Sequence, residues 1–389
     1  MANKSAEDNN NVLNSVLLER IRQIHESPCR AVLAITGGGA GVIGELLRHG
    51  SGSATVLDAV VPYSTNAMDR FLGRKPDKYC SEKTARLMAM VAYQRALELS
   101  RDTGELAAPN VIGIGATCKL KSANEREGRK HEVHVSIQAA CKTGVVTLEL
   151  TAERTREEEE YIAATLIFNV LARHCGVAEI DLPGGIGAGE GKGAGEGKGA
   201  GNEEKIVEKY SLVSGPVGDI LKQQSGNPAG YYERVGMARI NFNESNLPKE
   251  IKLVFPGSFD PCHRNHILMA RLASIKYNAP VHFEISLTNV DKPPIDFISL
   301  DQRLDSLRKY KAEAFMGDVY LTSAPLFLQK AALFPNSTFI VGADTINRIF
   351  DAKYYNGAVD TPTILDHFKE RNIRFMVFRR KAVEMSISP

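Results

Sequence analysis

The stretch from Gly257 to His266 carries the residue types best suited to chemistry in this chain. It reads GSFDPCHRNH and stands between the apolar run IKLVF and the helix-like run ILMARLASIK, which indicates a turn from a strand into a helix. Small residues at the carboxyl end of a strand let phosphates approach the backbone, and the next helix start offers free N–H groups and positive potential. Because His263 and His266 are three residues apart, we expect both on one side of the first helical turn, facing one anion.

Paired imidazoles beside phosphate oxygens suit phosphoryl or nucleotidyl transfer. In these reactions the protein mainly positions groups and neutralises developing charge, so no protein nucleophile is needed. A bare H-x-x-H is more often a helix cap followed by a surface residue. The strand–turn–helix context favours the functional interpretation for His263 and His266.

The elements around this motif must position it. The helix-like run is followed by the strand-like APVHFEISL, and the order strand, helix, strand predicts a right-handed parallel βαβ unit. The alternation continues through SLDQRLDSLRKYKAEAF, LFLQKAALF and STFIVGAD. We therefore expect an α/β domain with a parallel sheet in the second half.

The first half also alternates between strand and helix patterns. The runs 31–36 and 110–116 are apolar and typical of buried strands, whereas 81–100 has alanine and methionine at helical spacing after a Ser-x-x-Thr start. Residues 132–141 and 144–153 flank Lys142-Thr143-Gly144 and predict an antiparallel hairpin. An α/β layer fold follows.

Two groups of charged residues in this half are expected to have structural roles. The carboxylates Glu157 to Glu160 open a predicted helix over 156–175, and we interpret them as its solvated, well-capped start. His131 and His134 have the spacing of a metal pair, but side chains three apart on a strand point to opposite faces. We expect no metal site made from protein side chains.

A glycine-rich segment divides the chain nearly in half. Residues 184–201 contain GAGEGK twice and have no hydrophobic face, which is typical of a flexible linker. Its Lys192 and Lys198 are each followed by glycine, so the phosphate-loop pattern fails. The predicted organisation is a first domain, a linker, a connecting segment of undetermined fold and a second domain. Their ranges are 1–182, 183–202, 203–249 and 250–389.

Composition limits the function classes. Lys and Arg number 48 against 46 Asp and Glu, and a net charge of +2 gives no basic field for nucleic acid. The six cysteines form no C-x-x-C pair, which favours a reducing compartment. Without a membrane-length apolar run or a signal-peptide core, we expect a cytoplasmic protein that binds neither nucleic acid nor membrane.

Residues 251–380 resemble the HxGH nucleotidylyltransferases, in particular the nicotinate-mononucleotide and pantetheine-phosphate adenylyltransferases. The motif at 257–266 matches G-[SG]-F-[DN]-P-x-H-x-G-H except that Asn265 replaces glycine, and asparagine tolerates left-handed backbone. The runs ISLDQRLDSLRKY, VGADTINRI and FMVFRRK match later family segments in order.

The resemblance implies a Rossmann-like domain that uses ATP, or less favourably CTP, as substrate with Mg²⁺. It also implies site residues. The catalytic residues would be His263 and His266, and Arg303 would bind substrate. Nucleotide would be bound by Gly257, Ser258, Phe259, Asp260, Gly342 and Asp344.

One family feature is missing near the end of this sequence. The family's last strand is followed by an S-x-T-x-x-R-type loop that grips the triphosphate, and here Ser386 and Ser388 could begin such a loop but the arginine is absent. This leaves open a non-catalytic nucleotide-binding or regulatory protein as the alternative function.

Residues 33–175 resemble the C-terminal domain of the CinA family, whose members include nicotinamide-mononucleotide amidohydrolases. The match rests on TGGGAGVIGELL, Val61-Pro62-Tyr63-Ser64, CSEKTARLMA and GIGATCKL. Glycine stands where the family has its nucleophilic serine, and Met68 stands where it has lysine, so we expect no hydrolysis. Thr36, Ser64 and Thr117 remain as polar residues, each favoured as structural.

Together the two resemblances favour adenylyl transfer from ATP to a phosphate-bearing acceptor, plausibly a pyridine mononucleotide, with release of pyrophosphate. Loops such as 289–294 would set the acceptor. The CinA-like domain could also form homo-oligomers.

Overall fold

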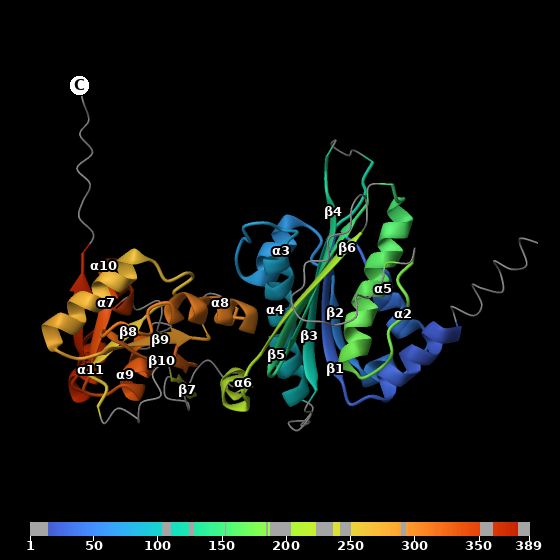
Figure 1. Cartoon of the computed structure of the whole chain (residues 1–389). Coiled ribbons are helices and arrows are strands. Elements are labelled where there is room, and N and C mark those ends of the chain that lie inside the picture. The colour runs from blue at the N-terminus through green and yellow to red at the C-terminus, as the bar shows by residue number, and fades with distance from the viewer. Residues whose placement is uncertain are drawn as a thin grey trace, which may run out of the picture. The chain divides into compact units, whose positions relative to one another are not determined.

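The computed structural model of the chain contains two units. It describes residues 15–102, 110–123, 128–151, 153–183, 186, 204–222, 236–241, 250–288, 293–350 and 361–379. The first unit comprises Met1–Val213 with Asp296–Ile298, and the second comprises Ser214–Ile295 with Ser299–Pro389. Each contains a six-stranded sheet with helices, which confirms the expected pair of α/β domains (Figure 1).

The sheet of the first unit has the strand order β2-β1-β3-β4-β5-β6. Neighbouring strands from β2 to β3 are parallel, and those from β3 to β6 are antiparallel. The strands are β1 (Arg30–Thr36), β2 (Val56–Val60), β3 (Val111–Lys119), β4 (His131–Ala139), β5 (Lys142–Leu150) and β6 (Lys205–Leu212). The predicted hairpin is β4 and β5, so that expectation is confirmed.

Helices lie on both faces of this sheet. The helix α4 (Glu82–Asp102) packs on β1, β3 and β4, and α5 (Arg156–His174) packs with α2 (Gly41–Arg48) over the other face. A Cβ at Gly113 would lie 2.1 Å from the Tyr93 backbone nitrogen of α4, so this strand needs glycine for the helix to approach. The helical spacing of Ala85, Ala89 and their neighbours therefore identified the buried face of α4 correctly. The shorter helices are a segment over 15–26, α3 (Thr65–Leu72) and the 3₁₀ turn η1 (Gly52–Ala54).

Described parts of the segment 203–249 belong to the two units. Its first strand, β6, pairs with β5, whereas β7 (Met237–Ile240) pairs with β10 (Met316–Thr322) of the second unit. The helix α6 (Gly215–Lys222) begins the second unit, whose boundary follows Val213. The glycine-rich linker itself, except Pro183 and Ile186, lies outside the described residues, so its flexibility stays a prediction.

The sheet of the second unit has the order β12-β11-β8-β9-β10-β7. Five strands are parallel and β7 is an antiparallel edge strand. The remaining bounds are β8 (Leu253–Pro256), β9 (Val281–Ser286), β11 (Thr338–Gly342) and β12 (Arg374–Phe378). The chain therefore starts at β8 in the middle, moves outward through β9 and β10, and returns to add β11 and β12 on the other side. This is the Rossmann-like arrangement, and its strand order reverses between β8 and β11.

Helices cover both faces of this second sheet as well. The helix α7 (Arg264–Tyr277) packs on β8, β9 and β11, whereas α9 (Phe327–Leu333) and α11 (Thr361–Glu370) share a phenylalanine-rich cluster with Val254 and Phe339. Val254 and Phe255 point to opposite faces, and Phe255 contacts His266 beside α7. The other helices are α8 (Phe297–Arg308) and α10 (Ala343–Ile349). In the described part of the chain no helix is both long enough and apolar enough to cross a membrane.

Candidate functional site

The motif identified from sequence forms the turn between β8 and α7, at the point where the strand order reverses. In doubly wound sheets this crevice, outside the carboxyl ends of the strands, is where ligands bind. The Gly257 N–H donates to the Glu284 carbonyl oxygen of β9 at 3.0 Å, which ties the start of the turn to the sheet. A Cβ at Gly257 would lie 2.6 Å from the Phe259 ring, so the turn requires glycine there.

The side chain of Phe259 holds this turn against the core of the second unit. Its backbone has a φ of 44°, and its fully buried ring contacts Phe283 and His266 with centroid distances of 5.2 and 5.1 Å. Its side chain therefore belongs to the core, and any contact of Phe259 with a nucleotide would come from its backbone. Left-handed backbone at a phenylalanine is uncommon, and the buried ring holds it in place.

The two histidines lie together, as their spacing predicts. Their rings stack with a centroid distance of 3.7 Å and an interplanar angle of 20°, and the His263 backbone N–H donates to His266 Nδ1 at 3.3 Å. His263 precedes the first residue of α7 and is exposed, whereas His266 is half-buried. Both imidazoles therefore stand at the helix start.

The environment of His266 fixes its protonation state. Burial, with a further contribution from His263, lowers the pKa of His266 to about 4, so the ring is neutral at pH 7. Because Nδ1 accepts the backbone N–H, the single proton of the neutral ring is on Nε2. His266 is thus a hydrogen-bond donor through Nε2 and carries no charge.

The guanidinium of Arg303, on α8, forms hydrogen bonds with the turn between β8 and α7. Its Nη1 donates to the Ser258 carbonyl oxygen at 3.0 Å and its Nη2 contacts the Asp260 carboxylate at 3.2 Å, with the arginine side chain only 12% exposed. One turn later on α8, the Ser306 hydroxyl accepts the Cys262 backbone N–H at 3.0 Å. The helix therefore holds the loop from 258 to 262 in shape.

Gly342 and Asp344 lie at the same edge of the sheet. The register pairs Leu253 of β8 with Thr338 of β11, and its continuation places Gly342 level with Gly257. A Cβ at Gly342 would meet nothing within 4 Å, and Asp344 stands in the first turn of α10. The predicted nucleotide-binding residues thus meet at the switch point, on two neighbouring strand ends.

Asn265 lies within α7 and is not among the positive-φ residues, so it fits the helix without the left-handed backbone invoked for it. Ser386, Ser388 and loop residues 289–292 lie outside the described residues. The triphosphate-gripping loop therefore stays a prediction.

The first unit has a hollow at the carboxyl end of β1. It is a cavity of about 460 Å³ between the glycine-rich turn, the end of β2 and the start of α5. Its lining comprises Ile35, Thr36, Gly37, Gly38, Ala40, Val61, Tyr63, Arg156, Glu157 and Glu160. Gly37 has a φ of 79°, and a Cβ there would lie 2.0 Å from the Cys118 carbonyl oxygen, so only glycine fits.

The charged start of α5 builds the wall of this cavity, which corrects its interpretation as a merely solvated helix start. Glu159 is fully buried and accepts from the Lys121 backbone N–H at 2.6 Å and from His131 Nδ1 at 2.5 Å. Glu160 accepts the Gly39 N–H at 2.8 Å, and Arg156 donates to the Gly37 carbonyl oxygen at 3.0 Å. The sequence showed only a run of charges, which does not reveal that its third and fourth carboxylates have buried partners.

The three hydroxyls considered in the sequence each make a hydrogen bond with the backbone. Thr36 donates to the Pro62 carbonyl oxygen at 3.2 Å, Ser64 caps α3 by accepting the Ala67 N–H at 3.2 Å, and Thr117 donates to the Tyr79 carbonyl oxygen at 3.0 Å. Met68, at the family's lysine position, is buried in α3. The lining residues include no serine, cysteine or lysine, and the loss of hydrolysis stays a prediction.

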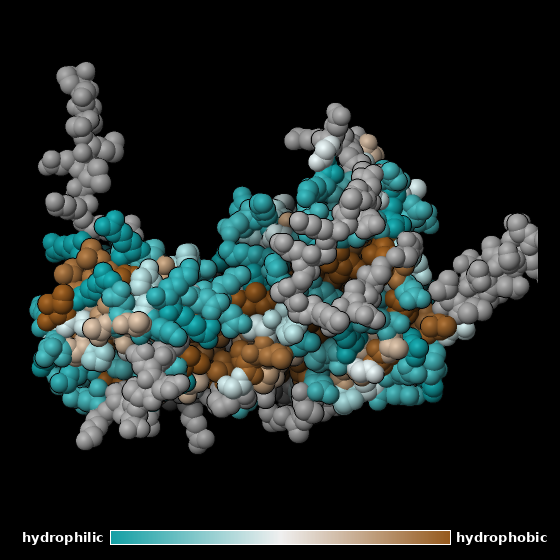
Figure 2. Space-filling view, viewed as in Figure 1, coloured by the Kyte–Doolittle hydropathy of each residue, from teal (hydrophilic) through white to brown (hydrophobic). Residues whose placement is uncertain are grey.

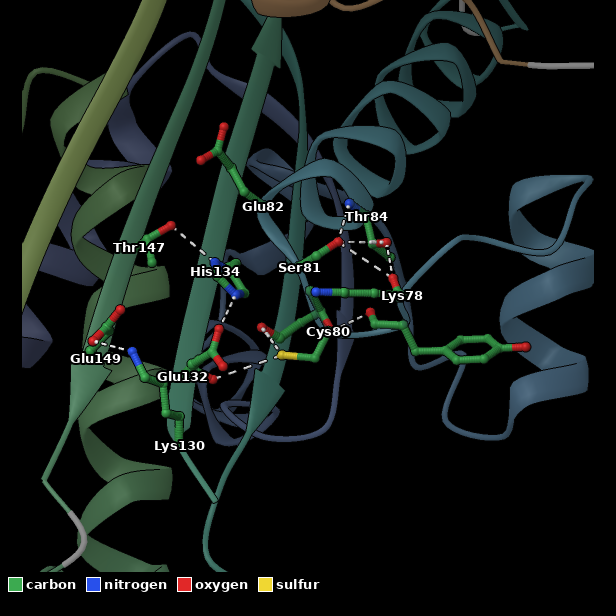
Figure 3. Close-up of polar contacts among 12 residues, drawn as sticks. Lys78, Cys80, Ser81, Glu82, Thr84, Lys130, Glu132, His134, Thr147 and Glu149 are labelled. Atoms are coloured by element: carbon green, nitrogen blue, oxygen red, sulfur yellow. Dashed lines mark hydrogen bonds and ion pairs between the residues drawn. The ribbon is translucent and has the colours of Figure 1, made fainter. Parts of the chain in front are cut away.

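A polar network on the α4 face of this sheet has the residue types of a nucleophile–base pair but not the geometry (Figure 3). His134 uses Nδ1 with Thr147 at 2.9 Å and Nε2 with Glu132 at 3.2 Å. The Cys80 thiol donates to the Thr117 carbonyl oxygen, and burial raises its pKa to about 11. A protonated thiol and an occupied imidazole make no reactive pair.

His131 and His134 point to opposite faces of β4, as their spacing on a strand predicts. His131 bonds Glu159 of α5, whereas His134 lies on the α4 face. Within the described ranges, no group of three His, Cys, Asp or Glu residues is placed to hold a metal ion.

Comparison with known proteins gives structural similarity over part of the chain. No family model and no curated protein matches the chain. A CinA-superfamily protein from Klebsiella pneumoniae is 16% identical, with 41% of this chain and 96% of that chain covered and a TM-score of 0.31. The competence/damage-inducible protein CihA from Agrobacterium tumefaciens is 19% identical, with 41% and 92% covered and a TM-score of 0.28. A CinA-superfamily protein from Escherichia coli is 16% identical, with 42% and 84% covered and a TM-score of 0.28. Similarity at this level says nothing about activity.

Proposed function

We propose that the second unit binds ATP in the crevice between β8 and β11 and transfers its AMP group to a phosphate-bearing acceptor. The observation that carries this proposal is the stacked pair His263 and His266 at the start of α7, placed at the switch point of a doubly wound sheet. A pyridine mononucleotide is the favoured acceptor, and this preference rests only on the resemblance of both halves to proteins of pyridine-nucleotide metabolism.

The chemistry requires no protein nucleophile. An oxygen of the acceptor phosphate, whose second pKa is about 6, is already anionic at pH 7 and attacks the α-phosphorus of ATP. A new phosphorus–oxygen bond forms as the bond to the β-phosphate oxygen breaks, and pyrophosphate leaves with that electron pair. The protein must therefore stabilise the charge that develops on the α- and β-phosphate oxygens.

Neutral donors at the helix start supply that stabilisation in this proposal. His266 offers Nε2–H, His263 stacks on it, and the first backbone N–H groups of α7 point toward the same region. Arg303 acts on the shape of the turn through Ser258 and Asp260. The site is thus organised to bind oxygens by hydrogen bonds more than by protein charge.

In this proposal Mg²⁺ binds together with the triphosphate of ATP. Mg²⁺ prefers octahedral oxygen ligands and commonly keeps waters alongside substrate phosphates. The Asp260 carboxylate near the motif is already held by Arg303, and among the described residues there is no protein metal cluster. Phosphate oxygens and water are therefore the ligands that fit Mg²⁺ here.

The test is calorimetric titration of the full chain with ATP, CTP and candidate mononucleotides, followed by a pyrophosphate-release assay. Tighter binding of ATP than of CTP, with pyrophosphate released only when an acceptor is present, is the expected result. ATP binding without turnover with any acceptor would instead support the alternative of a regulatory nucleotide-binding protein. Failure to bind either nucleotide would contradict both.

The cavity of the first unit supports a second, non-hydrolytic binding function. Glu160 in its wall is paired with Arg156 at 3.7 Å, whereas Glu157 and the exposed Tyr63 combine a carboxylate with an aromatic face, which suits a cationic ring such as a pyridinium. We infer that this cavity binds a pyridine mononucleotide without releasing ammonia from it. Glu157→Gln should weaken binding of nicotinamide mononucleotide, whereas the surface control Glu179→Gln should not; equal affinities would contradict the assignment.

A further inference from the structure

The outward face of α7 carries three aliphatic side chains that the fold leaves exposed. Leu268, Leu272 and Ile275 are 54%, 45% and 78% exposed, and hydrophobic residues are visible over α7, the gold helix of Figure 1, in the surface view (Figure 2). The opposite face of the helix packs on the sheet through Ile267, Ala270 and Ala273. The exposed residues are therefore not required to attach α7 to its own domain.

The spacing of these residues is that of a helix–helix seam. Steps of four and three residues, from Leu268 to Leu272 to Ile275, place them at successive d, a and d positions of a heptad. They lie on one stripe about 10 Å long, given a rise of about 1.5 Å per residue. Such i, i+4, i+7 anchors are typical of helix-in-groove and coiled-coil contacts.

Cations flank the stripe on both sides. In the same heptad register, Arg264 and Arg271 take successive g positions and Lys276 takes an e position. The helix α7 contains no Asp or Glu. Arg271 also pairs with Glu313 at 2.9 Å on the side facing its own domain. Residues at e and g select the partner of a seam by charge.

We propose that this face of α7 docks an amphipathic helix of a partner protein that has Leu or Ile along its seam and Glu or Asp beside it. Charge complementarity selects this occupant, because a second copy of α7 would place Arg and Lys opposite Arg and Lys. The inference does not depend on the proposed transferase activity, since it uses the outer face of α7 and not the histidines at its start.

The experiment uses the full chain and a labelled synthetic helix of three heptads with Leu at a and d and Glu at e and g. Fluorescence anisotropy should show saturable binding of this Glu peptide, at least about tenfold tighter than of a matched peptide with Lys at e and g, and weakened by added salt. Leu272→Glu should abolish binding without lowering the melting temperature. The control Leu365→Glu, at a 41% exposed leucine of α11, should leave binding unchanged.

A charge swap tests the selection rule separately. The double variant Arg264→Glu with Lys276→Glu should lose preference for the Glu peptide and gain preference for the Lys peptide. The proposal is overturned if the Glu peptide does not bind the folded chain, or if Leu272→Glu binds it as well as the original. It is also overturned if the chain does not bind the Glu peptide but binds phosphatidylserine-containing vesicles in a way that requires Leu272. Dimerisation of the chain through this face of α7 would overturn it as well.

Discussion

The two units place a glycine-containing turn at the same position, after a central parallel strand and before a helix, yet they use it differently. In the first unit the turn at Gly37 to Gly39 is held by the protein's own Arg156 and Glu160, and both of these side chains line the cavity together with Glu157. In the second unit the turn at Gly257 leads to two imidazoles, while Arg303 grips the turn from behind. The comparison teaches that one backbone arrangement can carry different chemistry, with carboxylates and an arginine around the turn in the first unit and imidazoles in the second.

The largest effect expected from this comparison concerns the buried carboxylate of the first unit. Glu159→Ala removes the buried carboxylate that His131 Nδ1 and the Lys121 N–H contact, so the first unit should lose about 3–5 kcal/mol of unfolding free energy. Denaturant unfolding followed by circular dichroism measures it. The exposed neighbour Glu157→Ala should change stability by less than about 0.5 kcal/mol; similar losses for both would mean that Glu159 is not the structural member of the run.

The glycine turns can be compared directly by adding a methyl group. Gly37→Ala combines positive φ with a contact of 2.0 Å to the Cys118 backbone, so we expect a loss of about 3 kcal/mol in the same unfolding measurement. Gly41→Ala, where a Cβ meets nothing within 4 Å, is the matched control and should change stability by less than about 1 kcal/mol. If Gly37→Ala lowered the unfolding free energy no more than Gly41→Ala does, the turn would have to be able to move away from β3.

In the second unit, Arg303→Ala should loosen the turn without removing a phosphate contact. Loss of its bonds to Ser258 and Asp260 should lower kcat about tenfold, roughly 1.4 kcal/mol, with a rise in KM for ATP. Steady-state pyrophosphate release measures both constants. Arg308→Ala, which removes an exposed pair with Asp305, is the control; an effect of Arg303→Ala confined to the acceptor's KM would instead make Arg303 a substrate ligand.

The effect that is smallest at neutral pH is a pH dependence of stability. The pKa of His266 falls from its ordinary value of 6.5 to about 4 on folding, so between these pH values the unfolded chain binds a proton that the folded chain does not. Its contribution therefore lowers stability as pH falls through this window and is absent above it. His266→Asn should flatten that part of the stability curve measured from pH 4 to 7; an unchanged slope would place the acid sensitivity in other groups.

The fold followed from local sequence pattern where that pattern was strong. Alanines at helical spacing gave the buried face of α4, and alternating strand residues gave the β4–β5 hairpin. The strand–turn–helix pattern around His263 gave the start of the Rossmann-like sheet. Each of these signals lies within one or two adjacent elements.

What sequence pattern did not reveal depends on contacts between distant segments. β6 joins the first sheet only through its pairing with β5, and Glu159 is buried only because His131 and Lys121 lie opposite it. The contact of the Arg303 guanidinium with the turn likewise depends on the packing of α8, and the predicted role of Arg303 in substrate binding stays a prediction. Long-range pairing of this kind leaves no periodic signal in the residues themselves.

The account depends most on the role given to His263 and His266. The decisive measurement is pyrophosphate release by His263→Ala and His266→Ala, alongside their ATP affinity and melting temperature. Removing a donor that acts mainly on the developing charge should lower kcat by roughly 10²–10³, or about 3–4 kcal/mol, with a much smaller change in ATP affinity and folding. The control is His367→Ala. His367 lies in α11, which precedes the amino end of β12 and so lies at the edge of the sheet opposite the proposed site, and this variant should release pyrophosphate at the original rate. Unchanged turnover in both histidine variants, with lowered melting temperatures, would show that the pair only caps the helix and would contradict the proposed site.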